Sequence, residues 1–308
     1  MQTIIPNNLE NNNQSQGAPV PPSEGFKGAI IECPRDAMQG WPHFIPTEKK
    51  IKYLNQLLTC GFHTLDFGSF VSPKAIPQMA DTAEVIKHLE LDKSHTKLLA
   101  IIANERGAAE AVSYDQITYL GFPFSISETF QQRNTNSSVD ESLKRVENIQ
   151  EICVKNNKEL VVYISMGFGN PYGDIYNEEI VINRSKQIES LGVKIISIAD
   201  TVGLATPSEV SALMKKIVPE FSNIDIGVHL HSSPLDREAK LDAALQAGCL
   251  RFDSAIKGIG GCPMAGNDLV GNMDTEVMID HFEKNSYKLN IDKTALEKCS
   301  MMANEIFV

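Results

Sequence analysis

The sequence predicts a (β/α)8 barrel, an α/β fold in which eight parallel strands alternate with helices and close into a ring. Eight short apolar runs have the length of buried strands, and helical patterns separate most of them. Strict alternation of strands and helices forces parallel strands with right-handed crossovers. Eight such units in about 250 residues fit a closed barrel. An open sheet of eight strands is the alternative, although no glycine-rich phosphate loop follows the first strand.

The predicted strands are bounded by turn residues and helix signals. They lie at residues 28–33, 62–67, 97–103, 116–121, 159–165, 193–199, 225–230 and 250–255. The first helix is predicted over residues 47–60, where apolar residues recur at helical spacing. Two later helices have clear start signals, because Ser138 with Glu141 and Thr206 with Glu209 have the spacing of capping boxes.

The composition is that of a globular protein with a sizeable core, since 42% of its 308 residues are hydrophobic and 22% are charged. The formal charge of −11 argues against general binding to nucleic acid or anionic membranes, which needs clustered Lys and Arg. No window approaches the roughly 18 consecutive apolar residues of a membrane span. We therefore expect neither a nucleic-acid nor a membrane partner.

Residues 1–26 differ from the rest of the chain, because they are rich in Asn, Gln, Pro and Ser and contain no Lys or Arg. This composition predicts a disordered N-terminal tail, followed by a barrel domain over residues 27–308. The tail lacks the features of a secretory or mitochondrial signal, so a cytoplasmic location is expected. The six cysteines, at positions 33, 60, 153, 249, 262 and 299, include no C-x-x-C pair and are expected to be free thiols.

A barrel places its chemistry at the carboxyl ends of its strands, where the loops that lead into the helices converge. Polar residues occur at or just after most of the predicted strand ends. They are Arg35, Asp36, Asp66, Asn104, Ser127, Glu128, Tyr163, Ser165, Asp200, Thr201, His229 and His231. The last strand leads into a glycine-rich loop that contains Cys262. Their convergence on one face is stronger evidence for a site than any one motif.

His229 and His231 stand two residues apart on a predicted strand and therefore point to the same face. With Asp36 at the same rim they form a candidate site for a divalent metal. Carboxylate and imidazole ligands suit Mg²⁺ or Mn²⁺, and Zn²⁺ is an alternative. The competing interpretation is that the histidines are hydrogen-bonded rim residues and that Asp36 is a turn residue or helix cap.

Arg35 lies beside this candidate site, where its guanidinium is suited to bind a substrate carbonyl or carboxylate; a structural ion pair is the alternative. Cys262 on a glycine-rich loop is suited to be a proton donor or a nucleophile, unless it is an ordinary thiol in a turn. Asp200 taken alone fits a turn at the end of a strand, and Asn272 a loop.

At these residues the sequence resembles the 3-hydroxy-3-methylglutaryl-coenzyme A lyase family, within a superfamily of metal-dependent lyase and synthase barrels. The resemblance covers about residues 27–300. It is carried by ECPRDAMQG, GSFVSPKAIPQM, NPYGDIYN, ADTVGLATP, HLH, and GIGGCP followed by VGN. The segment from Ser69 to Lys74 and the glycine-rich cysteine loop are the lyase-specific parts, because HLH and the Arg35-Asp36 pair alone would also fit related condensing enzymes.

The resemblance implies a role for each matched residue. The metal ligands would be Asp36, His229, His231 and Asn272. Arg35 would contact the substrate and stabilise an enolate, Cys262 would be the catalytic thiol, and Asp200 would be a further carboxylate of the site. Asp66 stands where characterised lyases carry glutamate, and Ser232 stands where they carry aspartate. The loop between Cys262 and Asn272 is one residue longer than in the animal enzymes.

The implied reaction is a metal-dependent retro-Claisen cleavage of 3-hydroxy-3-methylglutaryl-CoA to acetyl-CoA and acetoacetate, a step of leucine catabolism. The cofactor would be Mg²⁺ or Mn²⁺, the partner would be the acyl-CoA substrate, and the expected assembly is a homodimer. His229 or Asp36 would take the hydroxyl proton, with Asp200 in support. The alternatives are a lyase for a related 3-hydroxyacyl-CoA and a condensing acyl-CoA synthase of the same superfamily.

Overall fold

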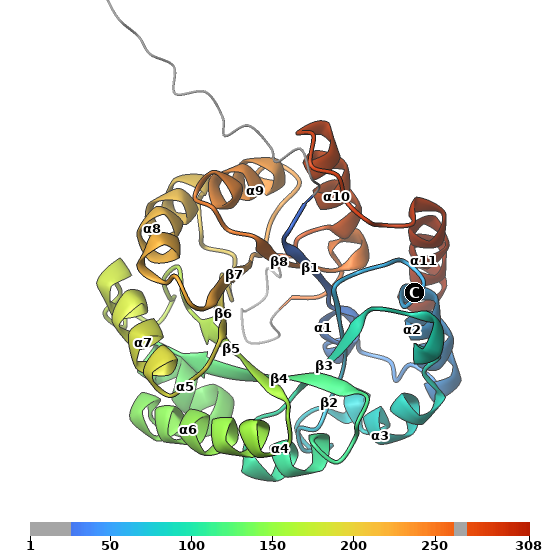
Figure 1. The fold of residues 1–308 in the computed structure, drawn as a ribbon, viewed down its shortest axis with the longest axis horizontal. Coiled ribbons are helices and arrows are strands. Elements are labelled where there is room, and N and C mark those ends of the chain that lie inside the picture. Colours follow the sequence, from blue (N-terminus) through green and yellow to red (C-terminus); the bar gives the residue numbers. More distant parts are fainter. Residues whose placement is uncertain (1–25, 262–269) are drawn as a thin grey trace, which may run out of the picture.

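The structure is a computed structural model that describes residues 26–261 and 270–308. The strands are β1 (Ala29–Glu32), β2 (Thr64–Ser69), β3 (Lys97–Ile101), β4 (Ile117–Ser125), β5 (Glu159–Ser165), β6 (Ile195–Ala199), β7 (Asp225–His229) and β8 (Arg251–Ser254). Each strand pairs in parallel with the next, and β8 pairs in parallel with β1 (Figure 1). The predicted (β/α)8 barrel is therefore confirmed, and the open sheet is wrong.

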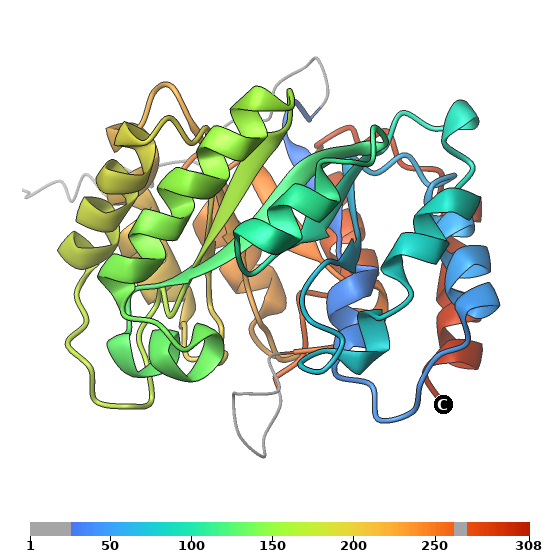
Figure 2. The same ribbon diagram turned by 90° about the horizontal axis from the view of Figure 1, so that it is seen from below.

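Helices surround the barrel on all sides in the views of Figures 1 and 2. They are α1 (Pro34–Gln39), α2 (Thr47–Leu57), α3 (Thr82–Val85), α4 (Glu105–Ala111), α5 (Glu128–Thr135), α6 (Val139–Lys155), α7 (Glu178–Ser190), α8 (Pro207–Glu220), α9 (Arg237–Gln246), α10 (Thr275–Lys284) and α11 (Lys293–Ile306). Short 3-10 turns lie at Pro77–Met79, Ile86–His88, Leu91–Lys93 and Ile256–Gly258. Both predicted capping boxes are present, at the starts of α6 and α8.

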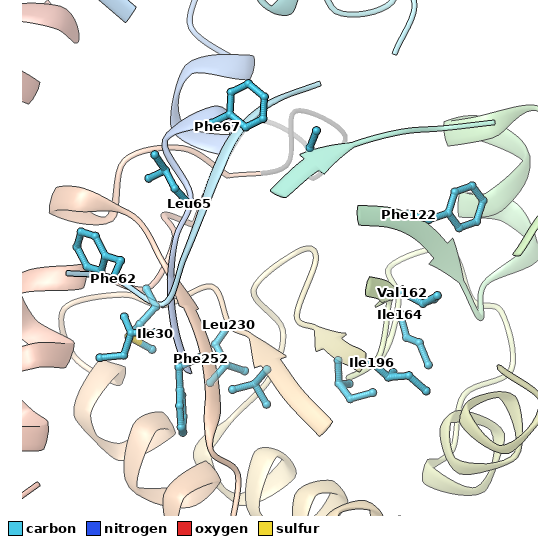
Figure 3. Packing of buried hydrophobic residues seen from close by; sticks show 14 of the residues in the cluster. Ile30, Phe62, Leu65, Phe67, Phe122, Val162, Ile164, Ile196, Leu230 and Phe252 are labelled. Atoms are coloured by element: carbon cyan, nitrogen blue, oxygen red, sulfur yellow. The ribbon is translucent and has the colours of Figure 1, made fainter. Parts of the chain in front are cut away.

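The hydrophobic core has two parts, as the alternation of side chains along each strand requires. The larger part lies between the sheet and the helices and includes Phe62, Phe122 and Phe252 (Figure 3). The smaller part fills the inside of the barrel; its buried members are Leu99, Ile101, Tyr119, Val161 and Ile195. The barrel interior is thus packed, so its two ends offer separate places for ligands.

Strand β4 is longer than the sequence indicated, because it continues beyond Gly121 to Ser125. Gly121 and Pro123 are of residue types that weaken a strand, but Phe122 and Phe124 are fully buried and hold the segment in the sheet. Pro123 sits opposite Tyr163 of β5. Burial of two aromatic side chains therefore outweighs the two residues that usually interrupt a strand.

The boundary between the predicted tail and the barrel lies near Phe26. Its backbone N–H donates to Lys288 O (2.9 Å), and its ring packs 5.3 Å from that of Phe282, measured between centroids. Residues 1–25 of the predicted tail, and the predicted catalytic Cys262, lie outside the described residues. The other five cysteines are buried free thiols.

Candidate functional site

A cavity of about 430 Å³ opens at the carboxyl end of the barrel. It is lined by residues at the ends of strands β1 to β7 and by the segment after β2. The lining includes Arg35, Asp36, Asp66, Tyr163, His229 and His231. The structure therefore brings five of the predicted site residues into one cavity, together with Tyr163 from the predicted rim.

Arg35 is held by two carboxylates. It lies on α1 directly after β1. Its Nε donates to Asp66 Oδ1 (3.2 Å) and Oδ2 (3.0 Å), and its Nη2 donates to Oδ2 (2.6 Å). Its Nη1 donates to Asp36 Oδ1 (2.9 Å) and to Gln39 Oε1 (2.9 Å). All three nitrogens thus have acceptors, and the bidentate contact with Asp66 fixes the plane of the guanidinium.

Burial raises the pKa of Asp66 to about 6, against the lowering effect of the Arg35 charge and hydrogen bonds. Burial also acts to raise the pKa of Asp36, but the charges of Arg35 and His229 and a hydrogen bond from Asn272 outweigh it and hold this pKa at about 2. Asp36 is the more strongly ionised of the two acids and is the better cation ligand.

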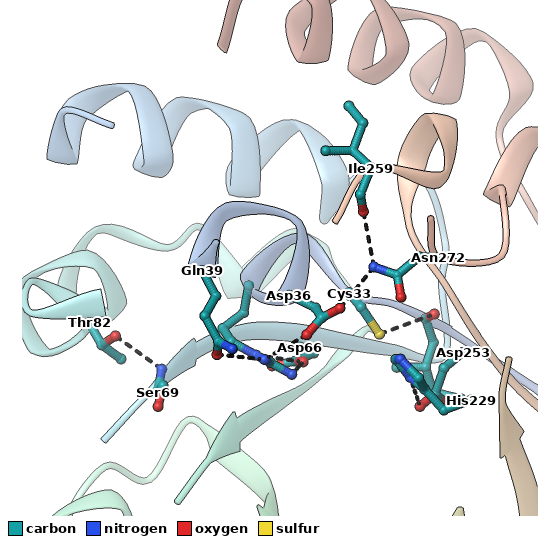
Figure 4. A network of polar contacts seen from close by, with 12 residues as sticks. Cys33, Asp36, Gln39, Asp66, Ser69, Thr82, His229, Asp253, Ile259 and Asn272 are labelled. Carbon is teal, nitrogen blue, oxygen red and sulfur yellow. Dashed lines mark hydrogen bonds and ion pairs between the residues drawn. The ribbon is translucent and has the colours of Figure 1, made fainter. Parts of the chain in front are cut away.

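Asn272 meets Asp36 across the rim. Its Nδ2 donates to Asp36 Oδ2 (2.8 Å) and to Ile259 O (3.0 Å), as Figure 4 shows. Its Oδ1 is buried and has no hydrogen-bond partner among the described residues. A buried amide oxygen without a donor needs an electropositive partner, so this atom is suited to face a cation.

The position of Asn272 is set by backbone contacts with the end of β7. Asn272 and His231 form an antiparallel bridge, Ser232 N donates to Gly271 O (2.9 Å), and Met273 N donates to Leu230 O (3.1 Å). This bridge brings together two segments that are about 40 residues apart in the chain.

Asp36, His229 and His231 each offer one ligand atom, and these atoms all lie within 4.8 Å of one another. Burial and the neighbouring His229 lower the pKa of His231 to about 4, so this imidazole is neutral at pH 7, as a metal ligand must be. Burial also acts to lower the pKa of His229, but the hydrogen bond and charge of Asp253 raise it above its ordinary value.

Asp253 of β8 was not predicted as a site residue. Its Oδ2 lies 3.1 Å from His229 Nδ1, and this contact leaves Nε2 of His229 for another partner (Figure 4). A carboxylate on the second nitrogen fixes the tautomer of a ligand histidine and increases its basicity. The signal in the sequence was an acid inside a short buried strand, where an unpaired carboxylate is costly.

Asp200 is turned toward α9 instead of the cavity. Its Oδ1 accepts from Ala205 N (3.1 Å), and its Oδ2 accepts from Lys240 Nζ (3.3 Å). Lys240, also unpredicted, is fully buried and donates to His231 O (2.7 Å). Asp200 therefore contacts the site through Lys240 and the backbone of His231.

Three of the predicted rim residues have structural roles. Asn104 and Ser127 cap the starts of α4 and α5, where their side chains accept backbone N–H groups. Glu128 Oε2 accepts from Val139 N (3.1 Å). In each case a polar residue after a strand begins the next helix or binds the start of one, which is an ordinary capping role of such residues.

The closed parallel barrel, with its cluster of carboxylate and imidazole groups at the carboxyl end, defines a (β/α)8-barrel protein with a site of the enzyme type. A model of the HMGL-like family matches residues 30–302. The chain belongs to the HMGL-like family, and the resemblance expected from the sequence is confirmed.

Two relatives are similar in sequence to this chain over most of their length. The hydroxymethylglutaryl-CoA lyase of Bacillus subtilis (strain 168) is 33% identical over 258 residues, which cover 84% of this chain and 85% of that protein. The cytoplasmic 3-hydroxy-3-methylglutaryl-CoA lyase of Rattus norvegicus is 33% identical over 251 residues, or 81% of this chain and 72% of that protein.

Solved structures agree with these sequence matches. The crystal structure of the Bacillus subtilis HMG-CoA lyase superposes with a TM-score of 0.85 at 32% identity and covers 91% of this chain and 93% of that chain. An HMG-CoA lyase from Acinetobacter baumannii, in complex with coenzyme A and 3-methylmalate, gives a TM-score of 0.84 at 30% identity and covers 91% of each chain.

Proposed function

We propose that this protein is a carbon–carbon lyase that cleaves 3-hydroxy-3-methylglutaryl-CoA to acetyl-CoA and acetoacetate. The observation that carries the proposal is the cluster of Asp36, His229 and His231 beside Arg35, at the catalytic end of a barrel in the HMGL-like family. Relatives that are named as lyases for this substrate and match most of the chain support the same reaction class.

The residues at the rim fit a divalent cation. We propose that Asp36, His229, His231 and Asn272 hold it, because the unpartnered Oδ1 of Asn272 lies beside the charged Asp36. Oxygen and imidazole donors favour Mg²⁺ or Mn²⁺. When bound, the cation supplies Lewis acidity that makes the substrate hydroxyl more acidic.

Arg35 is proposed to bind the thioester carbonyl, where negative charge develops as the carbon–carbon bond breaks. Its two carboxylate partners hold the guanidinium in place before the substrate arrives, so little reorganisation is needed during the reaction. Asp66 would be a positioning residue in this scheme. The shorter side chain of Asp66, where related lyases carry glutamate, still reaches Arg35.

The hydroxyl proton needs an acceptor at the rim, and we propose His229 or Asp36. The raised pKa of His229 favours it, and Asp253 would stabilise the imidazolium. A nitrogen that coordinates a cation cannot also accept a proton, so His229 is the acceptor only when its Nε2 does not bind the cation. Asp36 is the other candidate, and its pKa of about 2 makes it the weaker base. Asp200 would support the site indirectly, because Lys240 connects it to His231.

Cys262 is proposed to protonate the departing carbon. The described start of its loop runs close to the site, since a Cβ added at Gly260 would lie 2.8 Å from Asn272 Nδ2 and 2.9 Å from Ala37 Cα. Glycine is therefore required there for close approach to the proposed ligand Asn272. The thiol of Cys262 follows two residues later.

The test is to incubate the purified protein with 3-hydroxy-3-methylglutaryl-CoA and Mg²⁺ or Mn²⁺ under reducing conditions. Acetoacetate should be released, chelation should stop the release, and added metal should restore it. Cys262→Ala should lose most turnover while binding the metal normally. Absence of acetoacetate with this substrate, but cleavage of another 3-hydroxyacyl-CoA, would shift the assignment to a related lyase. Free CoA thiol released from acetyl-CoA and a 2-oxo acid would indicate a condensing enzyme.

The setting of the enzyme is also proposed from the sequence. We expect a cytoplasmic homodimer that acts in leucine catabolism, with the acyl-CoA as its partner. Within the described residues, the structure has no helix that is long and apolar enough to cross a membrane.

A further inference from the structure

A second cavity, of about 470 Å³, lies at the opposite end of the barrel. Six of the residues that line it begin strands, and four of these are charged: Lys97 begins β3, Glu159 begins β5, Asp225 begins β7 and Arg251 begins β8. The cavity is therefore built by the amino ends of the strands and is separated from the candidate active site by the packed interior of the barrel.

Arg251 is the unusual member of this cavity. It is only 3% exposed, and its Nε and Nη2 are buried without a hydrogen-bond acceptor among the described residues. A buried guanidinium normally has carboxylate or carbonyl partners, because burying an unpaired charge is costly. The arginine at the other end of the barrel, Arg35, follows this rule with acceptors at every nitrogen.

The surrounding residues make room for Arg251 and add a second cation. A Cβ at Gly227 would lie 2.9 Å from the Cγ and Cδ of Arg251, so the absent side chain leaves space for the arginine stem. The guanidinium carbon lies 5.9 Å from the centre of the Tyr119 ring. Lys97 Nζ lies 5.4 Å from the same ring and donates to Tyr119 Oη (3.1 Å). Two cations therefore converge on one aromatic side chain.

The electrostatics of the cavity agree with this arrangement. Burial and the charges of Arg251 and Lys97 lower the pKa of His63 to about 4, although Asp225 acts in the opposite direction. Glu159 and Asp225 are exposed, and within the described part of the chain neither forms an ion pair with Arg251 or Lys97. Water screens the negative charges of the exposed carboxylates, whereas the positive charge of the buried guanidinium is screened much less.

We propose that this cavity is a binding site for a small oxyanion, a carboxylate or a phosphate group, held by Arg251 with Lys97 as the second cation. A guanidinium matches both groups in shape and charge, and the ammonium adds a mobile donor. The site is distinct from the cavity that holds Arg35, and it does not depend on the reaction catalysed there.

The test measures thermal stability and binding heat for the full-length protein at constant ionic strength. Inorganic phosphate and succinate are titrated separately, with chloride as the reference salt, so that the two sources of the oxyanion are distinguished. Binding to the folded state should raise the melting temperature by roughly 5 °C at 100 times Kd. No stabilisation by either anion would overturn the proposal.

Variants place the effect in the cavity. Arg251→Met should weaken binding by roughly tenfold or more, as expected for loss of charge-assisted hydrogen bonds, and in chloride it should be at least as stable as the parent. Lys97→Gln changes an exposed side chain and provides the test if Arg251→Met does not fold; it should weaken binding severalfold. Lys144→Gln, on the outer surface of α6, is the matched control and should bind normally. Unchanged binding in both cavity variants, or its loss in Arg35→Lys, would overturn the proposal.

Discussion

The two ends of the barrel each contain a buried arginine, but the protein surrounds them differently. Arg35, at the carboxyl end, donates to Asp36, Asp66 and Gln39, and its plane is fixed. Arg251, at the amino end, has two buried nitrogens without an acceptor among the described residues and lies near an aromatic ring. Carboxylate partners hold a guanidinium in one orientation and neutralise much of its positive charge. A fixed orientation suits a group that must contact a reacting atom. The positive charge of an unpaired guanidinium is not neutralised, and this suits the binding of an anion.

The largest expected effect is at the carboxyl end. His231→Ala should remove a proposed metal ligand and lower turnover by roughly 1000-fold or more, since a catalytic cation supplies several kcal/mol of stabilisation. Acetoacetate release and metal content per protein measure this. The stabilisation by phosphate should persist, because His231 and Arg251 belong to different cavities. A variant that retains full metal and turnover would exclude His231 as a ligand.

Arg35→Lys should lower kcat by roughly 100- to 1000-fold, as for loss of an oxyanion donor. Lysine keeps the charge near Asp36 and Asp66 but cannot reproduce the bidentate geometry. Steady-state kinetics with the acyl-CoA substrate is the measurement, and metal content should not change. A change in KM alone would mean that Arg35 only binds the substrate.

Asp253→Asn should have a smaller effect, a loss of roughly 10- to 100-fold in metal affinity, because Asp253 orients His229 from its second nitrogen. Titration with Mn²⁺, followed by its paramagnetic signal, measures the affinity. The substitution should also shift the pH dependence of turnover, since Asp253 raises the pKa of His229. Unaltered affinity and an unaltered pH profile would leave Asp253 without a role in the site.

Glu32→Gln tests a buried carboxyl group of the scaffold, at the last residue of β1. Burial, opposed by hydrogen bonds from Thr275 Oγ1 (2.6 Å) and Ile256 N (2.9 Å), raises the pKa of Glu32 to about 8. The unfolded chain releases this proton near pH 4.5, so between pH 4.5 and 8 the folded state binds more protons and stability falls as pH rises.

The glutamine variant removes this titration. Its free energy of unfolding should fall less steeply between pH 5 and 8, by up to about 1.4 kcal/mol per pH unit. Urea unfolding at several pH values measures the slope, and Glu110→Gln, at an exposed position of α4, is the control. Equal slopes in Glu32→Gln and the parent would show that Glu32 is ionised in the folded protein.

The fold was predictable because burial dominates each strand. All eight strands were located, since short apolar runs that alternate with helical patterns are typical of the buried strands of a parallel sheet. The direction of a polar side chain at the end of a strand was harder to predict. Asn104 and Ser127 begin the next helix, whereas His229 and His231 face the cavity, and a shift of one residue decides between these outcomes.

The contacts behind the site could not be predicted from the sequence. Lys240 is on a helix, where a lysine is expected at the surface, but the fold buries it against Asp200 and the backbone of His231. Arg251 begins a strand, where its direction relative to the barrel interior is set by the register with β1. Contacts between segments far apart in the chain decide the burial of Lys240 and the direction of Arg251, and local sequence patterns do not reveal such contacts.

The backbone bridge between Asn272 and His231 has a consequence for how this protein can be altered. Hydrogen bonds from Ser232 N to Gly271 O and from Met273 N to Leu230 O fix the backbone on both sides of Asn272. The amide of Asn272 is therefore held by backbone contacts with the end of β7. The place of Asn272 therefore follows the carboxyl end of β7, so a change that shifts this end would move the amide and the imidazole of His231 together.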